Sequence, residues 1–323
     1  MPSKTLTALI SEKQIGQRLD QVLVELFPQY SRSYLKKMIL NKNVLLDNKI
    51  FDKPKTKIKN LTKIFIKIPE PVNLFNAQPM DLNIIYDDDD LLIINKPMNL
   101  VVHPGTGNSN GTLLNGILYY YPKNISVPRA GIIHRLDKNT TGLMIIAKKP
   151  SIQKYLVESL KKRNIIRQYE AITIGVINYS RGYINKSIRR HPNKRTIMKI
   201  DLLGKSAITH YRVLERFRAH THILLQLETG RTHQIRVHMA SINHPLVGDE
   251  CYAGKNLLNQ IPYDISLNVL YQLKKFKRQA LHASYLGFYH PIRRKYMEYK
   301  APLPQDMLDL ISILRTDLLQ NII

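Results

Sequence analysis

The chain has 323 residues, which is enough for two domains, and its 44% hydrophobic content can fill a sizeable core. Lysine and arginine number 49 against 24 aspartates and glutamates, so the formal net charge is +25. Such a field attracts polyanions, and nucleic acid is the leading candidate partner. A membrane-spanning protein is excluded, because no apolar run reaches the roughly 18 residues that a bilayer-crossing helix needs.

Cysteine usage and the first residues of the chain indicate where the protein works. Cys251 is the single cysteine, so the sequence predicts neither an internal disulfide nor a cysteine-based zinc site. Residues 1–7 lack the apolar core of a signal peptide. We therefore expect a protein of the reducing cytoplasm.

Patterns for nucleotide cofactors are incomplete. Gly105 and Gly107 follow a predicted strand, but Asn110 occupies the third glycine position of a dinucleotide loop. Residues 204–206 resemble the end of a phosphate-binding loop, but Lys199 stands where its first glycine belongs. The sequence thus predicts no cofactor.

The first 70 residues predict a small α+β unit. Apolar residues recur at helical spacing in 19–26 and again in 32–39, where Ser31 is a suitable N-cap. The second helix places Arg32, Lys36 and Lys37 on its polar face. Short strands are predicted at 44–46 and 64–68, with a turn at 47–48 after the first of them.

Two short helices with a basic face beside a small sheet resemble the S4 RNA-binding domain. That resemblance implies RNA contact by Arg32, Lys36 and Lys37, while the alternative is an ordinary solvated helix face. We expect this domain to span 15–68. Residues 69–79 contain three prolines and predict a linker, so the second domain is expected to span 80–323.

The second domain is predicted to contain many short strands and few helices. This pattern indicates an α+β fold with a mixed, mostly antiparallel sheet. Four aspartates, 87–90, are interpreted as a hairpin tip, since loops that bind hard cations space their ligands and include glycine; no metal site is predicted. The predicted segments are strands at 82–86, 91–95, 169–174, 209–213, 223–228 and within 280–299, helices at 152–163, 231–239 and 306–319, and a basic loop or hairpin at 187–199 that faces RNA.

Residues 131–148 form the stretch that carries the candidate functional carboxylate. It holds a single acidic residue, Asp137, between Arg135 and Lys138. Short apolar runs at 132–133 and 143–147 predict two buried strands, with Asp137 in the loop between them. Such a carboxylate is either a turn residue that accepts backbone hydrogen bonds or a functional group. The flanking cations suit a nucleophile and a structural ion pair equally.

Residues 134–143, His-Arg-Leu-Asp-Lys-Asn-Thr-Thr-Gly-Leu, resemble the signature of the RluA-type RNA pseudouridine synthases. Further segments match in order at 167–171, 229–239 and 279–291, so the resemblance covers nearly the whole chain. It implies the pseudouridine synthase fold, isomerisation of uridine without a cofactor, and Asp137 as the catalytic nucleophile. Thr141 departs from many members, which carry serine there, but it keeps the hydroxyl.

The resemblance also assigns residues around the nucleophile. Arg231 resembles the arginine that keeps the aspartate ionised, and its alternative role is phosphate contact. Arg236 is the second choice for that partner and is otherwise expected to contact RNA. Tyr169 matches the active-site tyrosine that stacks on uracil, and Leu281 matches an apolar pocket position; for both, simple core packing is the alternative.

Base flipping requires a group that fills the gap left in the RNA. Arg135, two residues before Asp137, is well placed to insert, although it could instead form a structural pair. His134 is expected near the RNA in a supporting position, because the chemistry assigns it no proton transfer. The histidines at 220 and 222 and at 233 and 238 lack helical metal-ligand spacing.

The resemblance is strongest to members that act on the large ribosomal subunit. It implies 23S ribosomal RNA or a large-subunit precursor as the substrate, at uridines of the helix 69 stem-loop, with support for subunit assembly. We expect a monomer without an obligate protein partner. One rival is a catalytically silent RNA-binding or ribosome-assembly protein. The other is a glycosidic-bond hydrolase, which would need a second carboxylate that no motif supplies.

Overall fold

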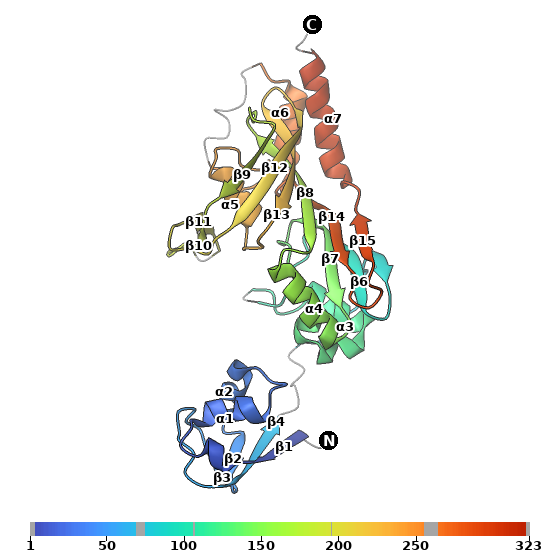
Figure 1. The fold of residues 1–323 in the computed structure, drawn as a ribbon. Coiled ribbons are helices and arrows are strands. Elements are labelled where there is room, and N and C mark those ends of the chain that lie inside the picture. Colours follow the sequence, from blue (N-terminus) through green and yellow to red (C-terminus); the bar gives the residue numbers. More distant parts are fainter. Residues whose placement is uncertain (1–3, 69–74, 106, 195, 255–263, 321–323) are drawn as a thin grey trace. The chain divides into compact units, whose positions relative to one another are not determined.

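The structure is a computed structural model that describes residues 4–68, 75–105, 107–194, 196–254 and 264–320. The chain divides into two compact units, Met1–Leu74 and Phe75–Ile323 (Figure 1). Each unit is described by itself. Among the described residues, no helix combines the length and apolar character that crossing a membrane requires.

The N-terminal unit is a four-stranded antiparallel sheet, in the order β1-β4-β2-β3, covered by two helices. Ser31 caps α2 as predicted, because its hydroxyl accepts a hydrogen bond from the Tyr34 backbone N–H at 3.2 Å. Asp47 and Asn48 adopt positive φ angles and form the tight turn between β2 and β3. The elements are β1 (Lys4–Leu9), α1 (Leu19–Leu26), α2 (Arg32–Leu40), β2 (Val44–Leu46), β3 (Lys49–Ile50) and β4 (Lys63–Ile68).

Strand β1 lies before the predicted start of this domain at residue 15. It pairs with β4 over its whole length, from Lys4 opposite Ile68 to Leu9 opposite Lys63. The partner strand is about sixty residues away in the sequence, so local pattern alone did not reveal the pairing. Of the predicted linker 69–79, residues 69–74 lie outside the described residues.

One residue of the predicted basic face of α2 also forms an ion pair with α1. The Arg32 guanidinium donates to the Asp20 carboxylate at 2.9 Å, and Arg18 donates to the same carboxylate at 2.9 and 3.1 Å. Burial alone would raise the pKa of Asp20, which is 3% exposed, but the two arginines lower it below its usual value. Arg32 therefore ties α2 to α1, yet its side chain is 57% exposed, and Lys36 and Lys37 are exposed as well.

The C-terminal unit is built on a nine-stranded sheet in the order β5-β6-β7-β14-β8-β13-β12-β9, with β15 paired to β14. Only β7 and β14 run parallel, so the predicted mixed, mostly antiparallel sheet is confirmed. The strands are β5 (Ile84–Asp87), β6 (Leu91–Lys96), β7 (Thr141–Ala147), β8 (Ile166–Ile174), β9 (Arg181–Asn185), β12 (Ile208–Arg216), β13 (His220–Leu227), β14 (Leu281–Tyr289) and β15 (Tyr296–Lys300).

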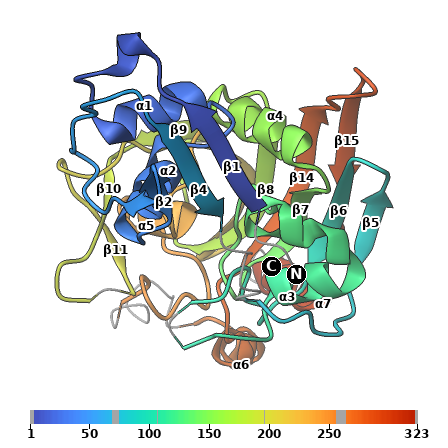
Figure 2. The ribbon, with the colours of Figure 1, turned by 90° about the horizontal axis from the view of Figure 1, so that it is seen from below.

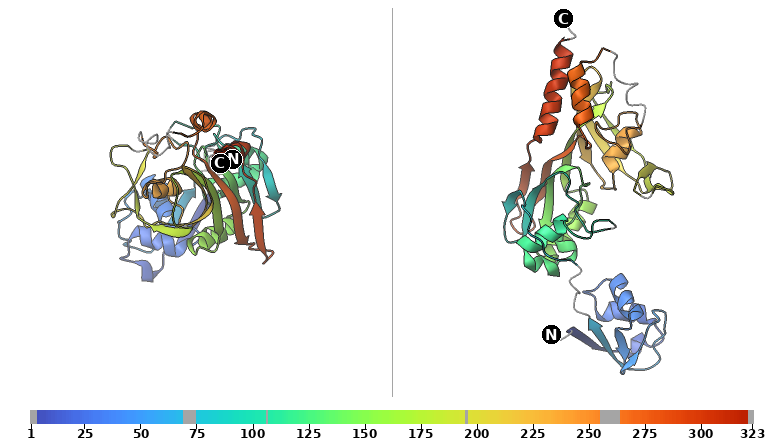
Figure 3. Two further views of the ribbon diagram at one scale, coloured as in Figure 1. Left: turned by 90° about the horizontal axis from the view of Figure 1, so that it is seen from above. Right: turned by 180° about the vertical axis from the view of Figure 1, so that it is seen from behind.

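Helices cover both faces of this sheet. Leu156 of α4 (Pro150–Lys161) packs with residues of β6, β7 and β14, whereas α3 (Leu113–Tyr120) and α5 (Gln234–Ala240) pack into a second apolar cluster. A third cluster joins β8 to α6 (Leu267–Lys275) and α7 (Gln305–Gln320), which lie side by side (Figure 3). Helices α3 and α6 were not predicted from the sequence.

The basic segment 187–199 forms a hairpin, one of the two predicted alternatives. Strands β10 (Ile188–Arg190) and β11 (Met198–Ile200) pair antiparallel outside the main sheet. The hairpin lies at an edge of the C-terminal unit in two views (Figures 1 and 2).

The strand predicted at 132–133 is wrong. Pro128–Gly131 forms a 3₁₀ turn in which Arg129 and Ala130 adopt positive φ angles, and Ile132 makes only an isolated bridge to Ile146. Gly131 also has a positive φ, and a Cβ there would lie 1.8 Å from the Ala147 carbonyl oxygen. This tight path beside β7 leaves no room for a regular strand.

Candidate active site

Asp137 lies in the loop that leads into β7, as the sequence predicted. The Thr140 backbone N–H donates to the Asp137 carbonyl at 3.1 Å and closes the loop. Gly142, at a φ of 115°, lets β7 approach β14 closely, because a Cβ there would lie 2.3 Å from the Ala283 carbonyl oxygen. The loop is thereby fixed next to Leu281, the first residue of β14.

Arg236 is the cation that faces Asp137. Its Nη1 lies 3.2 Å from the Asp137 carboxylate, and its Nε and Nη2 bind Asp249 at 2.7 and 2.8 Å. The Asp249 side chain is fully buried, and the Tyr252 ring lies 5.0 Å from the guanidinium carbon. Burial alone would lower the pKa of Arg236, but the Asp249 and Asp137 carboxylates outweigh burial and raise this pKa above its usual value. Arg236 is therefore a fixed, permanently charged group.

The expectation that Arg231 pairs with Asp137 is wrong. The Arg231 Nε donates instead to the Ser206 carbonyl at 3.2 Å. Helix α5 begins only at Gln234, after His233 in a left-handed conformation, so Arg231 precedes the helix while Arg236 points inward from it. Arg236 is 6% exposed and held between two carboxylates, and the expected RNA contact by Arg236 stays a prediction.

A small pocket of about 50 Å³ opens beside Asp137. Tyr169 reaches it from β8 and Leu281 from β14, each 4% exposed. Burial raises the pKa of Tyr169, the charge of Arg167 opposes this rise, and the charge of Asp137 adds to it. Four segments that are far apart in the sequence thus meet at the carboxylate. The pocket is lined by Arg135, Leu136, Asp137, Thr140, Tyr169, Leu227, Arg231, His233, Gln234, Ile235, Arg236 and Leu281.

A cleft of about 930 Å³ adjoins this pocket and shares Asp137, Tyr169, Arg135 and Arg231 with it. Its lining includes several cations and only two carboxylates, so it suits a polyanion. Burial, with Arg129 and Arg135, lowers the pKa of His103 to about 4. The lining cations are Arg129, Arg135, Lys161, Arg163, Arg167 and Arg231.

His134 lines the cleft as a half-buried residue whose Nδ1 is buried. Its Nε2 accepts a hydrogen bond from the Ile145 backbone N–H at 3.1 Å. Burial, and secondarily the charge of Arg167, lower the pKa of His134 to about 3, so the ring is neutral at physiological pH. This agrees with a supporting position and with no role in proton transfer.

Lys96, at the end of β6, was missed by the sequence reading. It is fully buried, and its ammonium donates to the carbonyls of Pro97, Leu100 and Lys138 at 2.6, 3.0 and 3.0 Å. Burial lowers the pKa of Lys96 to about 7 against the opposing charge of Asp137. The bond to Lys138 holds the residue that follows Asp137. A lysine at the end of a strand whose first four residues are apolar was the available signal.

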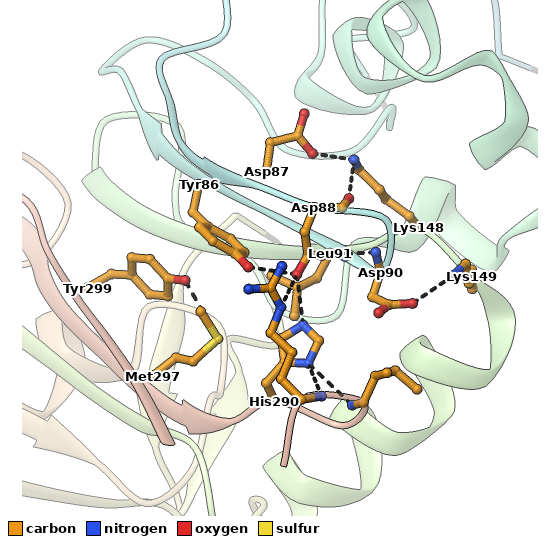
Figure 4. A network of polar contacts seen from close by, with 12 residues as sticks. Tyr86, Asp87, Asp88, Asp90, Leu91, Lys148, Lys149, His290, Met297 and Tyr299 are labelled. Atoms are coloured by element: carbon orange, nitrogen blue, oxygen red, sulfur yellow. Dashed lines mark hydrogen bonds and ion pairs between the residues drawn. The ribbon is translucent and has the colours of Figure 1, made fainter. Parts of the chain in front are cut away.

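Asp88, Asp90 and His290 form a group whose ligand-type atoms lie within 4.8 Å of one another (Figure 4). Their atoms are already engaged. His290 Nδ1 accepts from the backbone N–H groups of Ile292 and Arg293, so Nε2 carries the proton and donates to Asp88 at 3.1 Å. Asp88 also accepts from the Tyr86 hydroxyl and from two backbone N–H groups, and Asp90 pairs with Lys149. The group ties β14 to the tip of the β5–β6 hairpin.

Comparison with known proteins identifies the chain. Residues 90–241 match the family model for RNA pseudouridylate synthase, and residues 17–60 match that for the S4 domain. The chain is 54% identical to ribosomal large subunit pseudouridine synthase D of Salmonella typhimurium over 97% of this chain and 95% of that protein. The protein of the same name from Haemophilus influenzae is 49% identical over 99% and 98% of the two chains. The chain belongs to the RNA pseudouridine synthases.

Solved structures agree with this assignment. The structure of human RNA pseudouridylate synthase domain containing 4 has a TM-score of 0.56 and 26% identity, covering 72% of this chain and 93% of that one. Human RNA pseudouridylate synthase domain containing 1 has a TM-score of 0.53 and 25% identity, covering 74% and 98%. The synthase is thus an isomerase that acts on RNA, with an N-terminal S4 domain before its catalytic domain.

Proposed function

We propose that this synthase isomerises uridines in 23S ribosomal RNA and that Asp137 is its covalent nucleophile. One observation carries the proposal. The Asp137 carboxylate lies 3.2 Å from a permanently charged arginine, at the mouth of a pocket that also holds Tyr169 and Leu281. A carboxylate nucleophile needs a fixed charged partner that orients it, and Arg236 is placed to be that partner.

The reaction balances without a cofactor. A carboxylate oxygen of Asp137 bonds to the nucleoside, the N1–C1′ bond breaks, and the base turns within the pocket. A C5–C1′ bond then forms, the proton leaves C5, N1 takes up a proton, and the bond to Asp137 breaks. Tyr169 stacks on the uracil and assists proton removal from C5, and Leu281 forms the opposing apolar wall.

The substrate is proposed from the relatives, whose names specify the large ribosomal subunit. We propose uridines of the helix 69 stem-loop, in 23S ribosomal RNA or a large-subunit precursor, with a supporting role in subunit assembly. The cationic cleft and the exposed Lys36 and Lys37 support an RNA substrate. A monomer acting in the cytoplasm fits such a substrate. Mapping pseudouridines in 23S ribosomal RNA from cells with and without the protein tests this assignment.

Asp137→Asn tests the nucleophile. It keeps the shape and removes the charge, so tritium release from C5-labelled uridine should fall by a factor on the order of 10⁴ or more. RNA affinity in a filter-binding titration should change little, because many phosphate contacts support binding. Asp89→Asn is the matched control, since Asp89 is exposed at the tip of the β5–β6 hairpin. Substantial turnover by Asp137→Asn, free of host enzyme, would make Asp137 structural and favour a silent RNA-binding protein.

A further inference from the structure

Arg167 is a buried arginine that pairs with no carboxylate of the described residues. It lies on β8, is 8% exposed and lines the large cleft. Its Nε is buried and has no hydrogen-bond acceptor, and no ion pair joins its guanidinium to a carboxylate in the described part of the chain. A buried charge of this kind is costly unless something compensates it.

His134 presents a second donor in the same cleft. Because its Nε2 accepts from the Ile145 N–H, the neutral ring carries its proton on Nδ1. That Nδ1 is also buried and has no acceptor among the described residues. Buried polar groups are nearly always paired, so two orphan donors in one cleft wall indicate an acceptor that arrives with the ligand.

The positions of Arg167 and His134 place this acceptor beside the small pocket at Asp137. Arg167 is two residues before Tyr169 on β8, so both side chains project from the same face of the strand. His134 is three residues before Asp137 in the loop. Gly230 leaves space for the guanidinium, since a Cβ there would lie 3.0 Å from Arg167 Nη1.

We propose that Arg167, with His134 beside it, binds one backbone phosphate of the RNA next to the target uridine and so positions that nucleotide for Asp137. Among the acceptors that RNA offers, only the phosphate carries the negative charge that compensates a buried guanidinium. This inference rests on the proposed RNA substrate. It makes Arg167 a positioning residue that differs from Arg163 of the same cleft, which is already paired with Glu228.

Neutralising single phosphates tests the proposal. A set of helix 69 stem-loop RNAs, each with one neutral methylphosphonate linkage, is titrated by filter binding against the chain and against Arg167→Met. Both proteins carry Asp137→Asn, so that the RNA is not converted. One linkage near the target uridine should weaken binding to the Arg167 protein by about 10- to 100-fold. The same linkage should weaken binding to Arg167→Met less than about twofold, since the charged partner is absent.

Arg163→Met is the matched control, because it removes a cation of the same cleft and should leave the penalty at that linkage unchanged. Arg167→Met should also melt at the same temperature as the parent or higher, since it removes an uncompensated charge from the free protein. A structural role for Arg167 predicts a lower melting temperature instead. The inference would be overturned if a neutral linkage weakened RNA binding equally with and without Arg167. It would also be overturned if Arg167→Met bound the unmodified RNA as tightly as the parent protein. Failure of the 23S mapping alone would refute the substrate and not the phosphate contact.

Discussion

The exchange of Arg236 for lysine separates the role of this residue, which lies in α5, from that of Arg231, which precedes the helix. Arg236 uses three nitrogens at once, two on Asp249 and one on Asp137. A lysine ammonium would stand near the guanidinium carbon and could contact only one carboxylate closely. Asp249, which is buried and held at 2.7 and 2.8 Å, would retain it. Arg236→Lys therefore keeps the positive charge and removes the contact to Asp137.

The magnitude follows from the geometry. Two unit charges 3.2 Å apart attract by about 5 kcal/mol at an effective dielectric constant of 20, and lysine retains part of this at its greater distance. Losing one preorganised charged donor at a reacting group costs about 10²- to 10³-fold in turnover. The weaker bond to Asp249 should lower the free energy of unfolding by about 1–3 kcal/mol. The protein stays folded, whereas Arg236→Ala would cost about 3–5 kcal/mol by leaving buried carboxylates unpaired.

Single-turnover tritium release at saturating RNA, with urea denaturation of the same samples, measures both effects. Arg231→Lys is the matched control, because the Arg231 side chain donates to the Ser206 carbonyl, has no carboxylate partner among the described residues and lines the cleft. It should keep turnover within a factor of a few and alter RNA affinity instead. The reasoning is wrong if Arg231→Lys loses more turnover than Arg236→Lys while both proteins remain folded.

Three further outcomes are expected. Arg135→Ala should slow modification of a structured stem-loop more than that of an unpaired uridine, because Arg135 is exposed beside Asp137 and can occupy the gap of a flipped base; equal slowing of both RNAs would contradict this. Replacing Lys36 and Lys37 by glutamine should reduce the slope of log affinity against log salt by about two and leave turnover at saturating RNA unchanged. Burial, partly offset by Asp317, lowers the pKa of His220 to about 4, and both ring nitrogens are buried without a hydrogen-bond partner among the described residues. The unfolded chain therefore binds the extra proton between pH 6.5 and 4, so stability falls through that window as pH decreases, by up to about 3 kcal/mol. Urea denaturation at several pH values should show a shallower fall for His220→Leu, and identical slopes would refute this assignment.

Local sequence determined most of the fold's elements. The 3.6-residue and two-residue periodicities predicted α1, α2, α4 and α7 and most strands, because one face of each element is buried. Short apolar runs were ambiguous, so α3 was missed and residues 132–133 were assigned to a strand. There the positive φ angles of Arg129 and Ala130 depend on packing against β7, which periodicity does not report.

The candidate site likewise has features that the sequence predicted and features that only the tertiary structure decided. The resemblance of the sequence motifs to the synthase family pointed to Asp137, Tyr169 and Leu281, and all three side chains meet at one pocket. The sequence could not identify the partner of Asp137, because Arg231 and Arg236 belong to one motif. The start of α5 at Gln234 decides which of the two arginines turns inward. Arg167 could not be recognised as a buried cation, and for Lys96 the signal was its place at the end of an apolar strand, because burial is a property of neighbours brought together from distant segments. The sequence therefore determined which chemical groups the site contains. Tertiary packing decided which charges face each other and which remain uncompensated. The reason is that electrostatic energy depends on distance and burial and not on order along the chain.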